Sequence, residues 1–227
     1  MTTQLTIDVG SDGQTTGLVY ASRDVPAHAT FILAHGAGAG QQSAFIIGFP
    51  QGLSDRGIDV LTFNFLYTEQ GRRVPDATKK LDACYRVAVA AARHQFGRSD
   101  VFVGGKSMGG RIATHLAADD AAELGIRGVV ALGYPLHPPG KPQQLRAVHL
   151  PRLRVPMLIV QGERDPFGTP AEFQPVLDAM SAEVTVHVVE NGDHSLAPSR
   201  QKDKVASVYI ELQQLIAGWI RAHKEKG

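Results

Sequence analysis

An apolar run that ends in a glycine-rich turn, residues 101–110, constrains the fold of this 227-residue chain more than any other feature. The run reads Val-Phe-Val-Gly-Gly-Lys-Ser-Met-Gly-Gly, and a helix-like stretch, residues 111–116, follows directly. Gly105 and Gly109 stand two residues before and two residues after Ser107, where a side chain would clash if the chain folded back sharply. The pattern therefore predicts a buried strand, a tight turn with Ser107 at its apex, and then a helix.

Residues 105–109 also match the G-x-S-x-G pattern of a nucleophile elbow, which presents a serine hydroxyl above the start of a helix. The motif is weak evidence by itself, because 24 of the 227 residues are glycine. An alternative is that Ser107 only caps the helix that follows it. Two other glycine-loop motifs fail on spacing. Asp100 stands where a phosphate loop needs its first glycine, and Gln41 stands where a dinucleotide loop needs its third.

The composition is that of an ordinary globular protein, with 43% hydrophobic and 20% charged residues, and its length suits one domain, residues 1–227. A net charge of +1 gives no reason to expect a nucleic acid or an anionic membrane as partner. Cys84 is the only cysteine, so an internal disulfide is excluded. Neither a signal peptide nor a membrane-spanning stretch is visible, so we predict a cytoplasmic protein, and a homodimer is left open.

Short apolar runs, often rich in β-branched residues, recur along the chain, and from the third run onward helix-like stretches separate them. The expected strands are residues 5–9, 16–21, 30–34, 60–65, 101–103, 129–132, 157–160 and 184–189. The expected helices are residues 44–56, 77–95, 111–118, 171–182 and 204–223.

Strands of this kind fit a parallel sheet that is covered on both sides, because few of them alternate apolar with polar residues. The first two strands are joined by Gly-Ser-Asp-Gly at residues 10–13, a turn signal that predicts an antiparallel hairpin at one edge. We therefore expect an α/β fold, an eight-stranded and mostly parallel sheet with helices on both faces.

A serine nucleophile needs a base to take its proton and an acid to orient that base. Asp165 follows the strand at residues 157–160, and His194 follows the strand at residues 184–189. Ser107, Asp165 and His194 thus occur in the order serine, acid, histidine, each at the carboxyl end of an expected strand. Glu163 is a competitor for the acid, whereas the side chain of Asp193, next to His194, is expected to point elsewhere.

The loop after the strand at residues 30–34 reads His-Gly-Ala-Gly, residues 35–38. A loop in this position supplies one backbone N–H of an oxyanion hole, and the residue after the nucleophile supplies the other. The expected donors are Ala37 and Met108. We expect His35 to be structural, with its ring bonded to the loop backbone. Gly36 allows close approach of substrate, although the loop glycines equally suit a flexible turn.

Other loop residues at the strand ends are candidates for substrate binding. Tyr134, Leu136 and Phe167 are expected to line an acyl pocket, with plain packing as the alternative. Arg72 and Arg73 suit recognition of a carboxylate or phosphate, with a solvated loop as the alternative.

The segment after the sixth strand offers no room for a cap domain, because only a short polar stretch separates residues 134–140 from the next strand. An open site favours small acyl groups over long lipids. Lys106 is expected to point away from the substrate and to pair with a carboxylate.

The motifs at residues 35–38, 104–111, 162–165 and 192–194 resemble those of the α/β-hydrolase superfamily over almost the whole chain. The residues in these motifs look like those of a group related to dienelactone hydrolase. That group includes the hydrolase-like domain of NSL complex subunit 3 and its testis-expressed relative. The resemblance implies an uncapped eight-stranded sheet and a Ser-His-Asp triad. It also implies that some relatives serve as scaffolds. Dienelactone hydrolase carries a cysteine nucleophile, whereas this chain has Ser107.

The sequence as a whole predicts a serine hydrolase of the carboxylesterase class that cleaves a small ester, thioester or lactone through an acyl-enzyme on Ser107. Neither a metal nor an organic cofactor is expected, since the sequence has no spaced cluster of metal-ligating residues. The competing interpretations are a non-catalytic binding or scaffold protein on the same fold, and an acyltransferase or perhydrolase that uses the same triad.

Overall fold

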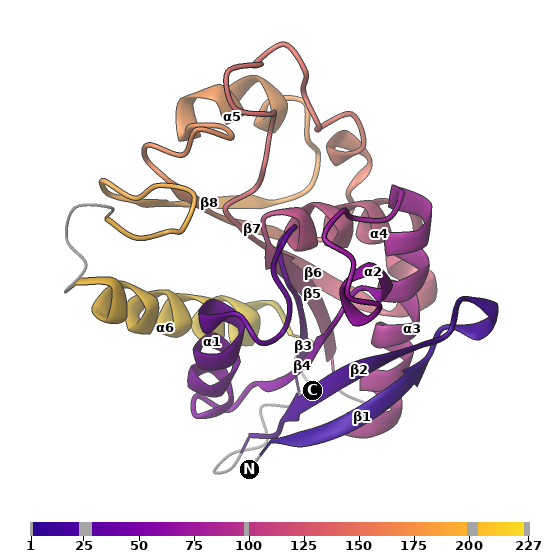
Figure 1. Cartoon of the computed structure of the whole chain (residues 1–227). Helices are drawn as coiled ribbons and strands as arrows, with labels where there is room; N and C mark the ends of the chain where they lie inside the picture. The colour runs from indigo at the N-terminus through magenta and orange to yellow at the C-terminus, as the bar shows by residue number, and fades with distance from the viewer. Residues whose placement is uncertain (1, 23–28, 98–99, 199–203, 225–227) are drawn as a thin grey trace.

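A single eight-stranded sheet runs through the computed structural model, which describes residues 2–22, 29–97, 100–198 and 204–224 (Figure 1). The strands are β1 Thr3–Asp8, β2 Gln14–Tyr20, β3 Ala29–Ala34, β4 Asp59–Phe63, β5 Asp100–Lys106, β6 Ile126–Leu132, β7 Met157–Gly162 and β8 Val184–Val189. The eight strands expected from the sequence are therefore confirmed, with ends that differ by a few residues.

The strand order is β1-β2-β4-β3-β5-β6-β7-β8. Strands β3 to β8 run parallel to one another, whereas β2 is antiparallel to both β1 and β4. The β1–β2 hairpin turns through the short 3-10 helix η1, Gly10–Asp12, as the turn signal predicts. Because the six parallel strands share one direction, their carboxyl ends open onto one edge of the sheet.

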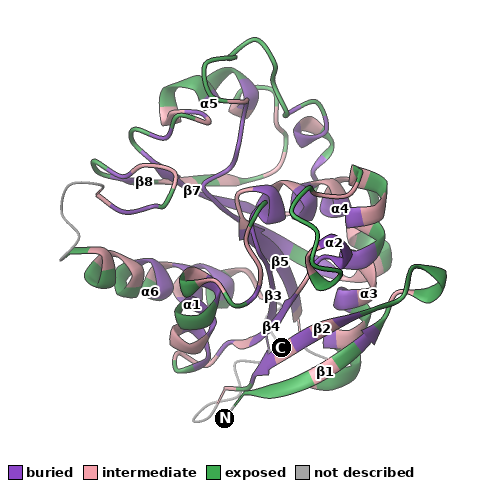
Figure 2. Cartoon of the chain, viewed as in Figure 1, coloured by how far each residue is buried: buried purple, intermediate pink, exposed green. Residues whose placement is uncertain are grey.

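Helices cover both faces of the sheet. Helices α1 Ala44–Ser54 and α6 Val205–His223 pack on one face, and α3 Thr78–Phe96, α4 Met108–Leu124 and α5 Pro170–Leu177 pack on the other. Each face has its own apolar core, and the central strands between them are buried on both sides (Figure 2). This double burial explains why the parallel strands are continuously apolar in sequence.

The structure differs from the sequence prediction at three helices. Helix α2, Leu66–Glu69, is a single turn in a segment that the sequence presents as strand end and polar loop, so β4 ends at Phe63. Helix α4 extends to Leu124, well beyond the expected end, whereas α5 ends at Leu177 rather than at residue 182.

Between β6 and β7 the described chain forms turns and the 3-10 helix η2, Leu150–Arg152, and no cap domain is inserted there. None of the helices within the described ranges is long and apolar enough to cross a membrane.

Candidate active site

The turn between β5 and α4 places Ser107 in a conformation that non-glycine residues rarely adopt, with φ 52° and ψ −115°. Its amide donates to the carbonyl of Leu132 at 2.9 Å, which anchors the turn to β6. A Cβ atom at Gly105 or at Gly109 would lie 2.5 Å from the carbonyl oxygen of Ala34. Only glycine therefore fits on either side of the serine, and the predicted strand–turn–helix is confirmed.

Ser107 forms one end of a chain of hydrogen bonds that joins three strand-end loops. Its Oγ lies 2.8 Å from Nε2 of His194, and Nδ1 of His194 lies 2.8 Å from Oδ2 of Asp165. The carboxylate can only accept, so Nδ1 of a neutral His194 carries the proton and Nε2 accepts from the serine hydroxyl. The serine side chain makes no bond that caps α4, contrary to the capping alternative.

Asp165 is held rigidly, because it is 1% exposed and its carboxylate accepts two further hydrogen bonds. Phe167 N donates to Oδ1 at 2.8 Å, and Gln161 Nε2 donates to Oδ2 at 2.9 Å. The competing acid, Glu163, instead accepts from the amide of Asn191 at 2.7 Å. Of the acids weighed from the sequence, the structure therefore brings Asp165 to His194.

Asp193 points away from the ring of its neighbour, as expected. Its Oδ1 accepts from the amide and the hydroxyl of Ser195, at 2.8 and 2.6 Å. These local bonds shape the turn that carries His194.

His35 is fully buried and holds the loop after β3 in place. Its Nδ1 donates to the carbonyl of Gly36 at 2.8 Å, and its Nε2 accepts from the amide of Phe65 at 3.1 Å. Burial lowers the pKa of His35, so the neutral ring that these two bonds require is favoured. The ring is bonded to the loop backbone, as the sequence analysis expects.

The two residues expected to supply the oxyanion hole lie beside the serine. Ala37 and Met108 line the same cavity as Ser107 and His194. Among the described residues, the amide of Ala37 has no hydrogen-bond partner. Met108 is the first residue of α4, where the N–H groups of a helix lack partners within the helix.

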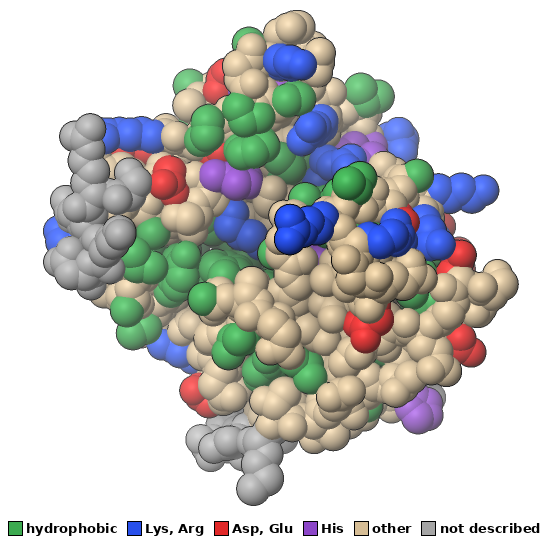
Figure 3. Space-filling model, in the orientation of Figure 1, with side chains coloured by type: hydrophobic (Ala, Val, Ile, Leu, Met, Phe, Trp, Pro, Cys, Tyr) green, Lys and Arg blue, Asp and Glu red, His purple; other side chains and the backbone are tan. Residues whose placement is uncertain are grey.

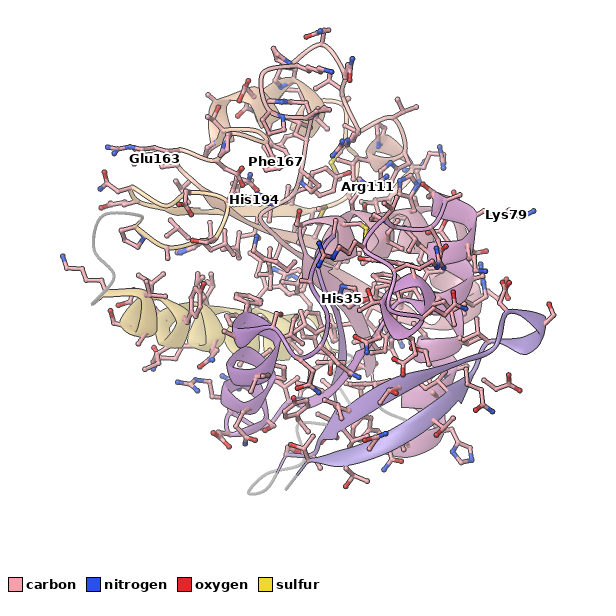
Figure 4. The ribbon with its side chains drawn as sticks, viewed as in Figure 1. His35, Lys79, Arg111, Glu163, Phe167 and His194 are labelled. Carbon is pink, nitrogen blue, oxygen red and sulfur yellow. The ribbon has the colours of Figure 1, made fainter. Side chains whose placement is uncertain are left out.

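Two cavities meet at Ser107 and His194. The first, here called the arginine cavity, has a volume of about 490 Å³ and is lined by Arg111, Arg146 and Phe167 beside the serine and histidine. The second, here called the apolar cavity, has a volume of about 310 Å³ and is lined by Gly36, Phe45 and Ile46. Figure 4 shows His194, Phe167 and Arg111 in one region, with Lys79 far to the right.

The structure places Phe167 and Gly36, two residues expected to bind substrate, beside the serine, and buries Tyr134 and Leu136 in the core. The ring of Phe167 packs on that of His194, with centroids 4.2 Å apart, and Gly36 borders the apolar cavity. Tyr134 and Leu136 are 0% exposed and pack in the core, so the expectation that they line an acyl pocket is wrong. Tyr134 instead donates its hydroxyl to the carbonyl of Arg146 at 2.7 Å.

Arg72 and Arg73 lie outside both cavities. They line a third cavity of about 420 Å³ together with residues 38–40 and Tyr67. Arg72 is already engaged, because its Nη1 forms a 2.7 Å ion pair with Asp76 and its other nitrogens donate to Gln70. These exposed arginines therefore do not reach the serine in this structure, and the solvated-loop alternative fits Arg72 better.

Among the described residues, no carboxylate forms an ion pair with Lys106, contrary to the sequence prediction. Its Nζ donates to the backbone carbonyl of His194, and the side chain borders the apolar cavity. Burial lowers the pKa of Lys106 to about 8, partly offset by Asp165 and Asp193. The lysine thus ties the strand before the serine to the loop that carries the histidine.

Sequence reasoning missed Arg111 and Arg146. Arg111 stands four residues after Ser107, about one helical turn along α4, so helical spacing alone could have placed it beside the serine. Arg146 lies in the irregular segment between β6 and β7, where no periodicity or motif marks it.

An eight-stranded, mostly parallel sheet with a strained serine after β5 and a histidine after β8 defines the class of α/β hydrolases. The chain belongs to the α/β-hydrolase domain family, whose model matches residues 27–221.

Solved structures of low sequence identity share the fold over nearly the whole chain. An α/β serine hydrolase homologue from Coxiella burnetii is 18% identical, with a TM-score of 0.76 over 95% of this chain and 96% of that one. Dienelactone hydrolase from Anabaena variabilis is also 18% identical, with a TM-score of 0.76 and 99% of each chain covered.

A third similar structure, from Xanthomonas campestris, is described as an α/β serine hydrolase without lid. It is 17% identical, with a TM-score of 0.76 over 100% of this chain and 96% of that one. These comparisons do not bear on the resemblance to NSL complex subunit 3, which stays a prediction.

Proposed function

We propose that the protein is a serine hydrolase that cleaves a small carboxylic ester, thioester or lactone through an acyl-enzyme on Ser107. The observation that carries the proposal is the hydrogen-bonded chain from Ser107 Oγ through His194 to Asp165, with both contacts at 2.8 Å. A chain of this kind activates an otherwise weak nucleophile, because the base accepts the proton as the oxygen attacks.

In the acylation step, Oγ of Ser107 bonds to the carbonyl carbon while its proton passes to Nε2 of His194. The carbonyl π electrons move to the oxygen and give a tetrahedral oxyanion. When the electrons return, the bond to the leaving group breaks, and Nε2 donates its proton to that group. The buried carboxylate of Asp165 stabilises the transient imidazolium and fixes its tautomer.

In the deacylation step, water takes the place of the leaving group. Nε2 of His194 accepts a proton from the water as its oxygen bonds to the acyl carbon. The bond to Ser107 Oγ then breaks, and the serine regains the proton. The products are the carboxylic acid and the free enzyme, so the proposed cycle requires neither a metal nor a redox cofactor.

In both steps the backbone N–H groups of Ala37 and Met108 donate hydrogen bonds to the oxyanion. Their position beside Ser107 and the lack of a partner for the Ala37 amide among the described residues support this role. Donors that are fixed before reaction cost no reorganisation, and one such donor is typically worth about 3 kcal/mol of barrier. The loop held by His35 therefore contributes to catalysis through its backbone.

The choice of small substrates rests on the two cavities, of about 490 and 310 Å³, which suit small molecules. The organisation of residues 1–227 as one domain, a homodimer and a cytoplasmic location remain predictions. A scaffold would not need the contacts of Ser107, Asp165 and His194 to be kept. An acyltransferase or perhydrolase would use the same chain with an acceptor other than water.

A fluorophosphonate probe tests the nucleophile directly. We expect the wild-type protein to become covalently labelled and Ser107→Ala to remain unlabelled, because the probe bonds to an activated serine oxygen. Labelling is read by intact mass, and thermal unfolding of both proteins serves as the folding control. A folded wild-type protein that does not react contradicts the hydrolase proposal, and labelling that persists in Ser107→Ala contradicts the residue assignment. Turnover of acetate esters then separates hydrolysis from transfer.

A further inference from the structure

Arg111 is a partly buried cation that lacks a carboxylate partner. Among the described residues, no Asp or Glu oxygen lies within ion-pair distance of its guanidinium. Its side-chain hydrogen bond runs from Nη1 to Nε2 of His115, at 3.3 Å. Burial lowers the pKa of His115 to about 4, so that ring is neutral and does not balance the charge of Arg111.

Removing a cation from water without a partner costs free energy, and most buried charges in proteins are therefore paired. Burial lowers the pKa of Arg111, in keeping with that cost. Asp82 acts on Arg111 through space without forming an ion pair with it, and burial raises the pKa of Asp82 to about 6. The guanidinium therefore faces the arginine cavity with capacity for a further anion.

A second arginine reaches the same cavity from a different element. Arg146 lies in the exposed segment between β6 and β7, and its side chain makes no ion pair with any described residue. The cavity also borders Asp76, but Arg72 neutralises that carboxylate through the 2.7 Å ion pair. The arginine cavity thus carries an excess of positive charge beside Ser107.

The apolar cavity, the second cavity at Ser107, has a different lining. It is lined by Phe45 and Ile46, with Lys106 at its border bonded to the His194 carbonyl. It shares Ala37, Ser107 and His194 with the arginine cavity. On the face drawn in Figure 3, several Lys and Arg side chains lie near one another, and hydrophobic side chains form separate groups. A substrate centred on Ser107 would extend one arm toward each cavity.

We propose that the substrate is an ester or thioester with a carboxylate on one side of the scissile bond and a short apolar group on the other. Arg111 and Arg146 bind the carboxylate, and the Phe45 side of the site binds the apolar group. A guanidinium matches a carboxylate in shape and charge and can donate two parallel N–H bonds to it. This inference rests on the proposed function and names the substrate class of the same site.

Paired chromogenic esters test the inference. On the acyl side, 4-nitrophenyl hemiglutarate is compared with its methyl-capped diester, which has the same chain without the charge. On the alcohol side, the butyrate ester of 4-hydroxybenzoic acid is compared with that of its methyl ester. We expect kcat/KM to be at least about tenfold higher for the charged member of one pair, as expected for a hydrogen bond to a charged group.

Arg111→Gln and Arg146→Gln should each reduce that charged-to-neutral ratio by about tenfold, and Arg146→Glu should reduce it further. The ratio is independent of how much enzyme folds, and Arg146 lies in an exposed segment where substitution is tolerated. Lys141→Gln is the matched control, because it removes one positive charge from the same exposed segment without lining the cavity. It should leave the ratio unchanged.

Equal turnover of charged and neutral esters in both pairs overturns the inference, and so does a preference that survives both arginine substitutions. A loss of preference in Lys141→Gln as large as in Arg146→Gln also overturns it, since general electrostatic attraction would then explain the effect. These outcomes presuppose turnover of the neutral esters. If neither ester is cleaved and the fluorophosphonate probe does not react, the proposed function itself fails.

Discussion

The role of each residue at the site depends on the hydrogen bonds that hold its side chain in one orientation. Asp165, for example, accepts hydrogen bonds from Gln161, Phe167 and His194, and these three bonds hold its carboxylate toward the histidine. Glu163 stands only two residues earlier, yet its carboxylate is turned to the backbone of a neighbouring loop. Identity and proximity in sequence are therefore poorer guides to role than the bonds that each carboxylate makes.

Replacement of Asp165 by Asn should lower kcat by a factor on the order of 10³–10⁴, because the amide favours the wrong tautomer of His194. The measurement is turnover of 4-nitrophenyl acetate at neutral pH. Glu163→Gln is the matched control and should change kcat by less than about threefold, since its carboxylate contacts only Asn191 N in the described structure. Similar losses in the two variants would contradict the assignment of Asp165.

Lys106 illustrates a residue that acts through its neighbour. Its Nζ holds the carbonyl of His194, so Lys106→Met should loosen the histidine loop and lower kcat by about tenfold with little change in KM. The charged form makes the stronger bond. Since the pKa is lowered to about 8, the ratio of wild-type to variant kcat should shrink as the pH rises through 8.

The control for this substitution is Lys79→Met on the outer side of α3, an exposed position away from the site (Figure 4). It should alter neither kcat nor KM. A rise in KM with unchanged kcat in Lys106→Met would show a role in binding rather than in positioning.

The elements around the elbow approach so closely that backbone packs on backbone. A Cβ atom at Gly109 would lie 2.5 Å from the carbonyl of Ala34, and one at Gly110 would lie 2.6 Å from the carbonyl of Gly105. Strands β3 and β5 and the start of α4 are thereby locked together. This contact sets the height of Ser107 above the sheet and its distance from the loop after β3.

Gly109→Ala should destabilise the fold by about 2–3 kcal/mol, because the neighbouring backbone cannot move aside without breaking the sheet. Gly48→Ala in α1 is the opposite case, since its Cβ meets nothing within 4 Å and the position is helical and exposed. That change should stabilise the protein by about 0.5–1 kcal/mol. Urea unfolding of both variants measures the difference, and equal effects would contradict the packing argument.

At the scale of the whole molecule, the parallel sheet gathers loops from β3, β5, β7 and β8 at one edge. These loops are far apart in sequence, as the distances of 58 residues from Ser107 to Asp165 and 29 from Asp165 to His194 show. The described chain inserts no cap over this edge. The site is therefore bounded by its own loops and two small cavities, which limits the length of substrate that gains contacts.

Turnover of 4-nitrophenyl esters of increasing chain length should reflect this open architecture. We expect kcat/KM to rise to about six acyl carbons and then to level off or fall, because further methylenes extend into water and bury no apolar surface. The assay is run below the micelle concentration of each ester. A preference of tenfold or more for the dodecanoate over the butyrate would contradict it.

Much of this fold was predictable because its signals are local. The apolar runs determine the strands, and the glycines around Ser107 determine the turn, since both depend on residues close in sequence. The order of Ser107, Asp165 and His194 at strand ends predicted a triad, with Glu163 left open as the acid. One failure involved Tyr134 and Leu136, whose loop position suggested a pocket, although both are buried in the core.

The sequence by itself thus determined the strands, the elbow and the order of serine, acid and histidine at strand ends, because periodicity and turn chemistry depend on neighbouring residues. Only the tertiary structure decided which side chains surround them. The choice of Asp165 over Glu163 needed the structure. Arg111 and Arg146 line one cavity, and Lys106 binds the His194 carbonyl, only because distant segments pack together. The same packing keeps Arg72 away from the serine. The positions of charged side chains and cavities depend on such long-range contacts, and a local sequence pattern does not predict them.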